Sequence, residues 1–310
     1  MKIFITGGSG FIGQRTIKHL LDGGSEIELL AVTRSHAIRG NGDTDSRITW
    51  ARADITNSIE MQKLLGAFKP DVCLHLAWYA EPGKYLTSHK NLLMMQTSLD
   101  LIQTAAAIGC KRFVAAGTCA EYTNQDRPLL EEDPTAPSNL YSACKLAVSH
   151  IGNALANEHD MAFVWGRVFY LFGPGEDQRR VIPSVTHSLL TNQKVPATSG
   201  EQVRDFLHVD DVAAAFVALC KNNSEGKYNI SSGDPVTMRA LLEKTAQIVG
   251  RPNKIQFGSR PKNLFDPPYI VGNSQRLQNL GWSPQYSLFE GLRDMVSWCR
   301  NNQDLGSSSE

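Results

Sequence analysis

Apolar and polar positions alternate along this chain in two periods, one typical of short strands and one typical of amphipathic helices. A β-rich run at 2–6 is followed by apolar residues at helical spacing from Phe11 to Asp22. Further strands are predicted at 26–32, 48–53, 71–77, 112–116 and 162–165, and further helices at 59–68, 91–108 and 140–157. Such alternation predicts an α/β fold, a doubly wound and mainly parallel sheet with helices on both faces.

The turn between the first strand and the first helix is rich in glycine, with the sequence Gly7-Gly8-Ser9-Gly10-Phe11-Ile12-Gly13. A strand, a glycine turn and a helix are the context that a dinucleotide fingerprint requires. Gly7 permits the tight turn, Gly10 lets the backbone approach a pyrophosphate, and Gly13 lets the helix pack close to the sheet. Because the helix N-terminus adds free N–H groups and a partial positive charge, the turn predicts a dinucleotide cofactor.

The end of the second predicted strand indicates which cofactor is preferred. An NAD site usually places a carboxylate there to bind the ribose hydroxyls. This chain has Thr33-Arg34-Ser35 instead. A guanidinium pairs bidentately with phosphate, so these residues suit a 2′-phosphate. NADPH (NADP) is therefore favoured over NADH.

A tyrosine and a lysine stand four residues apart in Tyr141-Ser142-Ala143-Cys144-Lys145, so both project from one face of the predicted helix. A neighbouring ammonium is expected to lower the pKa of the Tyr141 phenol by stabilising the phenolate. The phenol can then protonate the alkoxide that hydride delivery forms, or deprotonate an alcohol in reverse. Thr118, just past the fifth strand, can hold the same oxygen, so hydride transfer to or from a carbon bearing oxygen is predicted.

Composition narrows the class of protein. The 31 basic and 31 acidic residues balance, which argues against nucleic-acid and polyanionic partners. No apolar stretch is long enough to span a membrane and no signal peptide is evident, so we expect a cytoplasmic enzyme with no membrane partner. The six cysteines form no metal-spaced cluster, so no metal site is expected, and they suit reduced, buried thiols. A disordered tail is expected at 303–310.

The motifs GGSGFIG, AGTCAEY, YSACK, FGPG and VRDFLHVDDV together resemble the extended short-chain dehydrogenase/reductases of the NAD-dependent epimerase/dehydratase type, which act on nucleotide sugars. The resemblance runs from Met1 to about Trp298. It implies a Rossmann-like sheet at 1–168, joined again by part of 207–230, as the dinucleotide-binding domain. A smaller C-terminal α/β substrate domain would comprise 169–206 and 231–302. It also implies a homodimer that pairs through the two long helices.

The resemblance also implies roles for individual residues. Thr118, Tyr141 and Lys145 would be the catalytic residues. The cofactor would lie along Gly7, Gly10, Phe11, Ile12, Gly13, Thr33, Arg34, Ser35, Asp54, Ile55, Leu76, Ala77 and Lys145. The nucleotide-sugar substrate would contact Trp78, Thr118, Cys119, Arg180, Val181, Arg204 and Arg260. Arg204 and Arg260 would grip the nucleotide diphosphate, although Arg204 beside Asp205 could instead form a structural ion pair.

Departures from the family pattern narrow the predicted reaction. The 4,6-dehydratases carry an acidic pair directly after the threonine, where this chain has Cys119 and Ala120, with Glu121 one position late. The epimerase-reductases carry a catalytic cysteine at the position of Ala120. The asparagine that members often place early in the helix before the fifth strand falls at about Met94 here, with Asn91 one turn earlier. Of the family's reaction steps, only hydride transfer keeps the residues that it needs in this chain.

The predicted reaction is therefore NADPH-dependent reduction of the C4 ketone of a nucleotide-linked 4-keto-6-deoxyhexose, with Tyr141 as the proton donor. One alternative is a nucleotide-sugar 4-epimerase with tightly bound NAD(P). Arg34 favours the reductase, because an epimerase keeps its cofactor bound and gains nothing from NADPH. A second alternative is a reductase of a small non-nucleotide ketone. The rings of Trp78, Tyr79 and Tyr85 could line the sugar's 6-methyl group or simply pack.

Overall fold

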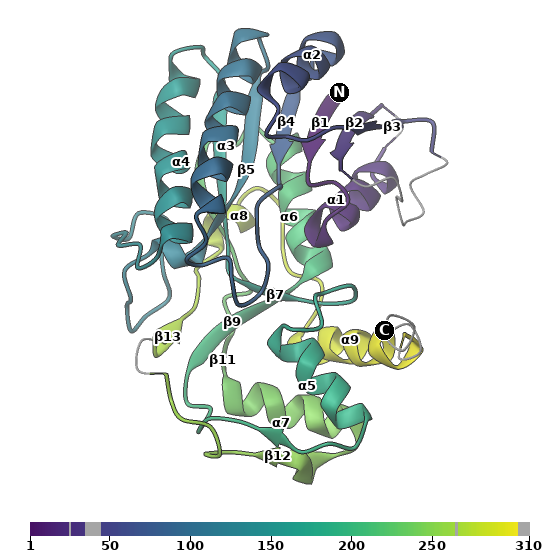
Figure 1. Cartoon of the computed structure of the whole chain (residues 1–310), viewed down its shortest axis with the longest axis vertical. Coiled ribbons are helices and arrows are strands. Elements are labelled where there is room, and N and C mark those ends of the chain that lie inside the picture. Colours follow the sequence, from purple (N-terminus) through teal and green to yellow (C-terminus); the bar gives the residue numbers. More distant parts are fainter. Residues whose placement is uncertain (25, 35–44, 264–265, 303–310) are drawn as a thin grey trace.

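The computed structural model describes residues 1–24, 26–34, 45–263 and 266–302. Its main feature is a seven-stranded sheet with the order β10-β6-β5-β4-β1-β2-β3, in which neighbouring strands are parallel (Figure 1). The strands are β1 (Lys2–Thr6), β2 (Glu28–Thr33), β3 (Ile48–Arg52), β4 (Val72–His75), β5 (Arg112–Thr118), β6 (Ala162–Val168) and β10 (Gly226–Ile230). The predicted α/β class with a Rossmann-like, doubly wound parallel sheet is confirmed.

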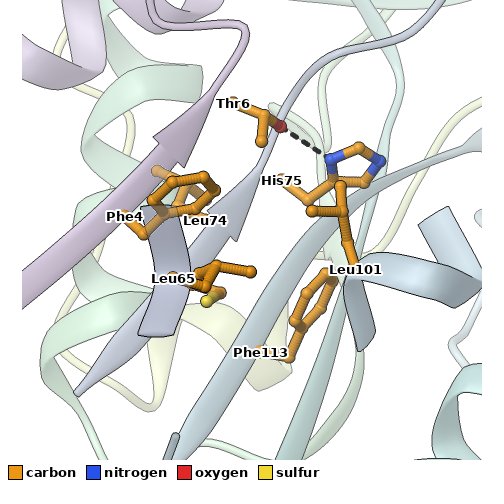
Figure 2. A pocket seen from close by; sticks show the side chains of 8 residues that line it. Phe4, Thr6, Leu65, Leu74, His75, Leu101 and Phe113 are labelled. Atoms are coloured by element: carbon orange, nitrogen blue, oxygen red, sulfur yellow. Dashed lines mark hydrogen bonds between the residues drawn. The ribbon is translucent and has the colours of Figure 1, made fainter. Parts of the chain in front are cut away.

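One face of the sheet is covered by α2 (Ser58–Phe68), α3 (Lys90–Ala107) and α4 (Leu140–Asn157). Apolar side chains from these helices and from the strands form a continuous buried cluster that includes Phe4, Leu65, Leu101 and Phe113. Figure 2 shows these four side chains around a small gap beside His75. The gap is too small to admit a water molecule, so this layer is packed core rather than a ligand pocket.

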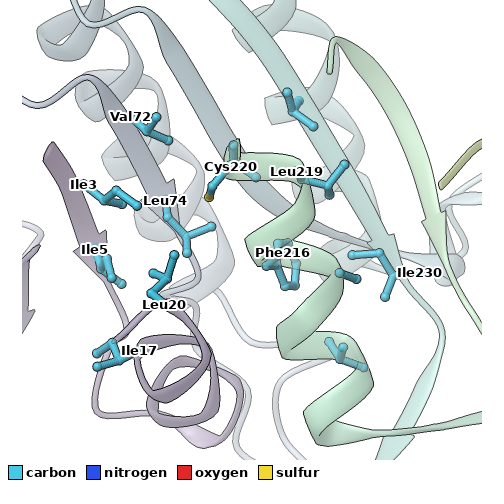
Figure 3. Packing of buried hydrophobic residues seen from close by; sticks show 14 of the residues in the cluster. Ile3, Ile5, Ile17, Leu20, Val72, Leu74, Phe216, Leu219, Cys220 and Ile230 are labelled. Carbon is cyan, nitrogen blue, oxygen red and sulfur yellow. The ribbon is translucent and has the colours of Figure 1, made fainter. Parts of the chain in front are cut away.

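The other face is covered by α1 (Phe11–Asp22) and α6 (Val209–Lys221), which pack against each other. Figure 3 shows Ile17 and Leu20 of α1 and Phe216 of α6 in one apolar layer with Ile5 of β1. The helix α6 lies late in the chain, and β10 follows it and pairs with β6. The segment near 209–230 is therefore part of the large sheet and its helical cover.

The predicted elements of the first 165 residues are all present, with shifts at their ends. The strand predicted at 71–77 ends at His75, and Leu76 and Ala77 continue as irregular backbone beyond it. The strand predicted at 112–116 runs on to Thr118 because its pairing with β6 continues to that residue. Thr118 is thus the last residue of β5, held by strand pairing instead of lying on a free loop.

A smaller group of elements lies beyond the end of the large sheet that faces away from the N-terminus (Figure 1). Because β1 starts at the opposite end and the strands are parallel, this is the carboxyl end of the sheet. The group comprises β7 (Tyr170–Phe172), α5 (Val181–Leu190), β8 (Val195–Pro196), β9 (Val203–His208), β11 (Pro235–Thr237), α7 (Met238–Val249), β12 (Ile255–Gln256), β13 (Tyr269–Ile270) and α9 (Leu288–Asn301). The short helix α8 (Gln275–Gln278) instead packs against β10 of the large sheet. The functional division into two domains stays a prediction.

Candidate active site

The glycine turn after β1 brings three parts of the chain into contact. Gly7 has a φ of 74°, and a Cβ there would lie 2.7 Å from the backbone nitrogen of Ala77. A Cβ at Gly13 would clash with the Gly7 carbonyl and lie 2.8 Å from the Cα of Gly8. The turn therefore closes only with glycine at these positions, and it lies against Leu76 and Ala77 at the end of β4. Phe11 and Ile12 form the first turn of α1 directly after it.

The end of β2 presents a cation next to a carboxylate. Arg34 is exposed, and it helps to hold the pKa of Asp54 below its usual range. The largest cause of that lowering is the Thr56 backbone N–H, which donates to Asp54 Oδ1 at 3.0 Å. Thr33 is buried and donates to the Ser9 hydroxyl at 3.2 Å, so the end of β2 contacts the glycine turn. Ser35 lies outside the described residues.

The catalytic candidates meet between β5 and α4. Tyr141 and Lys145 lie in the first turns of α4, which begins after an N-cap in which Asn139 Oδ1 accepts from the Ser142 backbone N–H at 3.0 Å. The Lys145 ammonium is 4% exposed and donates to the Ala116 carbonyl of β5 at 2.7 Å. The Tyr141 ring stands edge-on to Tyr85, with 4.9 Å between ring centroids. A hydrogen bond with Thr118 also acts on the Tyr141 phenol.

Burial sets the pKa values of this pair in a way that differs from the sequence expectation. Burial, with Tyr85 adding to it, raises the pKa of Tyr141 above its ordinary value, and the Thr118 hydrogen bond opposes the shift. Burial also lowers the pKa of Lys145 to about 7, against the opposing charge of Glu121. The lowering of the Tyr141 pKa expected from the Lys145 ammonium is therefore not found, because burial moves that pKa upward. Tyr141 is consequently a phenol at neutral pH, the form that donates a proton.

Glu121 has a structural role that the sequence interpretation missed. Its fully buried carboxylate accepts from the Thr118 backbone N–H at 2.9 Å, the Trp165 indole at 3.0 Å and the Arg167 guanidinium at 2.7 Å. Thr118 and Glu121 form a capping box around a single 3₁₀ turn at Cys119–Glu121. The pattern Thr-x-x-Glu is the sequence signal that could have indicated this role.

The surroundings of Cys119 make its thiol unreactive. It packs in a buried cluster with Tyr122, Leu129, Phe169 and Ile270. Burial raises the pKa of its thiol to about 12, so the thiolate is scarce at neutral pH. Across the described residues, no group of histidines, cysteines and carboxylates could hold a metal ion.

Arg180 and Val181, two substrate candidates, come from the smaller group of elements, and Arg180 lies beside Tyr85. Arg180 is the N-cap of α5, and its guanidinium carbon lies 5.2 Å from the centroid of the Tyr85 ring. Val181, the next residue, is 49% exposed. Since Tyr85 also contacts Tyr141, it links the substrate candidate Arg180 to the candidate catalytic residue Tyr141.

Arg204 and Arg260 lie in different settings. Arg204 is buried and donates to Asp266 at 2.6 Å, so its ion-pair partner is not the neighbouring Asp205. Asp205 accepts instead from the backbone N–H groups of residues 232, 233 and 272. Arg260 is exposed, and its backbone N–H donates to the Ala197 carbonyl at 3.1 Å. That the two arginines meet on one diphosphate stays a prediction.

His75 fixes the end of β4, next to the glycine turn (Figure 2). Its Nδ1 lies 2.6 Å from the Thr6 hydroxyl and its Nε2 lies 2.9 Å from the Ser98 hydroxyl. Ser98 donates its own proton to the Met94 carbonyl, so Nε2 carries the histidine proton and Nδ1 accepts from Thr6. Burial lowers the pKa of His75 to about 3, so the ring is neutral and serves the fold.

The fold and this site together define an α/β protein in which a glycine turn and a tyrosine–lysine pair lie at the carboxyl end of a parallel sheet. The chain belongs to the NAD dependent epimerase/dehydratase family, whose model matches residues 3–231, and the resemblance to extended short-chain dehydrogenase/reductases is thereby confirmed. UDP-glucose 4-epimerase of Halalkalibacterium halodurans is 26% identical, with 94% of this chain and 93% of that protein covered. CDP-abequose synthase of Salmonella typhimurium is 27% identical, with 95% and 97% covered.

A solved structure extends the similarity to the whole chain. The structure of MoeE5 in complex with UDP-glucuronic acid and NAD matches with a TM-score of 0.83 at 25% identity. It covers 97% of this chain and 100% of MoeE5. The similarity therefore includes the smaller group of elements as well as the large sheet.

Proposed function

We propose that this chain is a nucleotide-sugar enzyme that reduces the C4 ketone of a nucleotide-linked 4-keto-6-deoxyhexose with NADPH. The half-buried, protonated Tyr141 beside Lys145 and Thr118 carries this proposal, because it would be a proton donor at the carboxyl end of a dinucleotide-binding sheet. The substrate class is supported by the family and by relatives whose names refer to UDP-glucose and CDP-abequose.

The loop after β5 favours reduction over dehydration. Elimination of water needs an acid and a base beside the sugar. The Glu121 carboxylate is buried and accepts hydrogen bonds from Trp165 and Arg167, and the thiol of Cys119 has a pKa of about 12. Neither residue is available for that chemistry, so hydride transfer with proton transfer is the reaction that the described residues support.

The described residues fit a dinucleotide. The turn at Gly7 and Gly13 has no room for a Cβ, and the end of β4 at Ala77 closes against it, which is the cradle that a pyrophosphate needs. We propose NADP rather than NAD because exposed Arg34 stands where an NAD site would place a carboxylate. When bound, the cofactor would supply a hydride to the C4 carbon.

The chain's own residues complete the reduction. Tyr141 donates its hydroxyl proton to the C4 oxygen as that oxygen gains negative charge, and Thr118 donates a second hydrogen bond to hold it. Lys145, with a pKa of about 7, keeps a substantial ammonium fraction at neutral pH, and this charge stabilises the tyrosinate that proton transfer leaves. Solvent then returns the proton to Tyr141.

The nucleotide part of the substrate would contact the smaller group of elements. Arg180 at the start of α5 lies beside Tyr85, and Tyr85 contacts the ring of Tyr141. Arg204 and Arg260 would pair with the diphosphate, and a substrate phosphate would compete with Asp266 for Arg204.

The test is oxidation of NADPH, followed by its absorbance, with dTDP-, CDP-, GDP- and UDP-linked 4-keto-6-deoxy sugars, and with NADH in parallel. Stoichiometric consumption with one sugar supports the reductase and names its nucleotide. A second candidate is the 4-epimerase, which the similarity to UDP-glucose 4-epimerase favours. Interconversion of C4 epimers without net consumption of cofactor would establish it. Tight NADPH binding without either reaction would point to a small non-nucleotide ketone.

We also propose a homodimer that pairs through α3 and α4. Exposed apolar side chains on these helices support it, since Leu92, Leu93 and Ile151 are 46%, 53% and 44% exposed. Light scattering should give twice the chain mass of 34.2 kDa, and a monomer would exclude the pairing.

A further inference from the structure

The indole of Trp78 contacts both members of the catalytic pair. The Lys145 Nζ lies 3.8 Å from the centroid of the Trp78 ring, within the range of a cation–π contact. The Tyr141 ring meets the same indole in a T-shaped contact at 6.2 Å between centroids. Trp78 follows the end of β4, whereas Tyr141 and Lys145 belong to α4, so the contact forms only in the folded chain.

The orientation of the indole is fixed by Asn91. The Trp78 Nε1–H donates to Asn91 Oδ1 at 2.9 Å. The Asn91 amide nitrogen donates to the carbonyls of Tyr85 and Ser88 at 2.6 and 2.8 Å. With Nδ2 on two carbonyls, the amide can present only its oxygen to the indole. Asn91 has no exposed surface, so this arrangement is held inside the protein at the start of α3.

We propose that Trp78 is a positioning residue that holds the Lys145 ammonium between its ring face and the Ala116 carbonyl, with Asn91 fixing the plane of the ring. A cation between an aromatic face and one carbonyl is stabilised without a paired carboxylate. The ammonium therefore stays in place and remains able to lose its proton. This role deepens the proposed function, on which the catalytic value of Lys145 rests.

The titratable groups around Lys145 come from three elements. Glu121 lies at the end of β5, and its charge favours the ammonium. His75 on β4 is neutral, since burial lowers its pKa to about 3. Tyr141 lies one turn earlier on α4 and is protonated. Changing the electron density of the Trp78 ring leaves these three side chains in place. The contribution of the ring to the Lys145 pKa can therefore be tested separately from theirs.

The experiment is an NMR titration of the free, full-length protein labelled with ¹³C at lysine Cε, with the Lys145 signal assigned by its loss in Lys145→Arg. Mono-, di- and trifluorotryptophan are placed at position 78, because fluorine weakens the ring's attraction for a cation while keeping its shape. The Lys145 pKa should fall stepwise, by roughly half to one pH unit in total. The same series at Trp298, a half-buried residue of α9, is the matched control and should leave it unchanged.

A Lys145 pKa that stays constant across the Trp78 series overturns the proposal. Asn91→Ala tests the second contact: freeing the indole should shift the Lys145 pKa in the same direction as fluorination, and an unchanged value removes Asn91 from the role. The titration uses neither cofactor nor substrate. A shifting pKa without reductase activity would therefore contradict the proposed function alone, and reductase activity with a constant pKa would contradict the role of Trp78 alone.

Discussion

Two buried charges lie close to the end of β5 and are treated differently by the protein. Glu121 accepts hydrogen bonds from three groups, one of which is the oppositely charged Arg167. Lys145 has a backbone carbonyl and an aromatic face as its closest partners. The first charge is paired and anchors the backbone of Thr118. The second is buried with weaker compensation, so its pKa falls to about 7 and it can exchange a proton under ordinary conditions.

This difference separates a structural charge from the charge that we propose to be functional. A buried ion pair keeps both partners charged over a wide pH range, since neither can lose its charge without leaving the other unpaired. A buried lysine without a paired carboxylate is instead poised between its two protonation states. In this site the paired charge holds the backbone of Thr118 in place, and the poised charge lies one helical turn from Tyr141, the proposed proton donor.

The largest expected effect is on the proton donor. Tyr141→Phe should lower turnover by about 10²- to 10⁴-fold, because the acid is removed while the ring remains. NADPH binding, measured by fluorescence titration, should be unchanged. Tyr286→Phe, which removes the hydroxyl of an exposed tyrosine whose ring stacks on His208, should keep its turnover. Wild-type turnover in Tyr141→Phe would end the proposed mechanism.

Breaking the paired charge should act on stability. Glu121→Gln leaves Arg167 charged and fully buried, so the free energy of unfolding should fall by about 3–5 kcal/mol in urea titrations. Glu290→Gln is the matched control, because Glu290 also closes a capping box, with Ser287, but lies on the surface. Its effect should be far smaller. Equal losses in the two variants would show that the cap matters at position 121 and the ion pair does not.

The poised charge predicts a pH-dependent stability. The folded-state pKa of Lys145 is about 7, below its ordinary 10.5, so between these values the unfolded chain binds more protons and wild-type stability rises with pH. Lys145→Met removes this contribution. The free energy of unfolding of Lys145→Met minus that of wild type should be greatest near pH 7. Above pH 7 this difference should decrease by roughly 1 kcal/mol per pH unit. Urea titrations of both proteins across this range measure the slope.

Lys63→Met, which changes an exposed lysine of α2, is the control and should show no such slope. A constant difference between Lys145→Met and wild type at all pH values would mean that Lys145 keeps an ordinary pKa in the folded protein. The contrast with the paired charge would then be lost.

The smallest expected effect concerns the cofactor. Arg34→Asp should lower the preference for NADPH over NADH by roughly ten- to a hundredfold, since one charge-assisted contact to the 2′-phosphate becomes a repulsion. The ratio of kcat/KM for the two cofactors measures it. Lys63→Asp makes the same change of charge away from the glycine turn and should leave the ratio as it is. An unchanged ratio in Arg34→Asp would remove the reason to prefer the reductase over the epimerase.

The sequence by itself determined the elements and their order. Strand and helix periods are local, so the parallel sheet, the glycine turn and the spacing of Tyr141 and Lys145 on one helix could all be predicted. The ends of elements were less certain, because pairing with a neighbour decides them. The extension of β5 to Thr118 depends on β6, whose paired residues lie 50 positions later in the chain.

Only the tertiary structure decided which partner each charged side chain has. Arg204 is paired with Asp266 and not with adjacent Asp205, and Glu121 with Arg167 of another strand. The Lys145 ammonium is held by Ala116 of β5 and by Trp78, which lies in the segment after β4. The physical reason is that burial and long-range contacts determine electrostatic surroundings. Residue spacing places Lys145 one helical turn from Tyr141, but the packing around the two side chains determines the protonation state of the lysine.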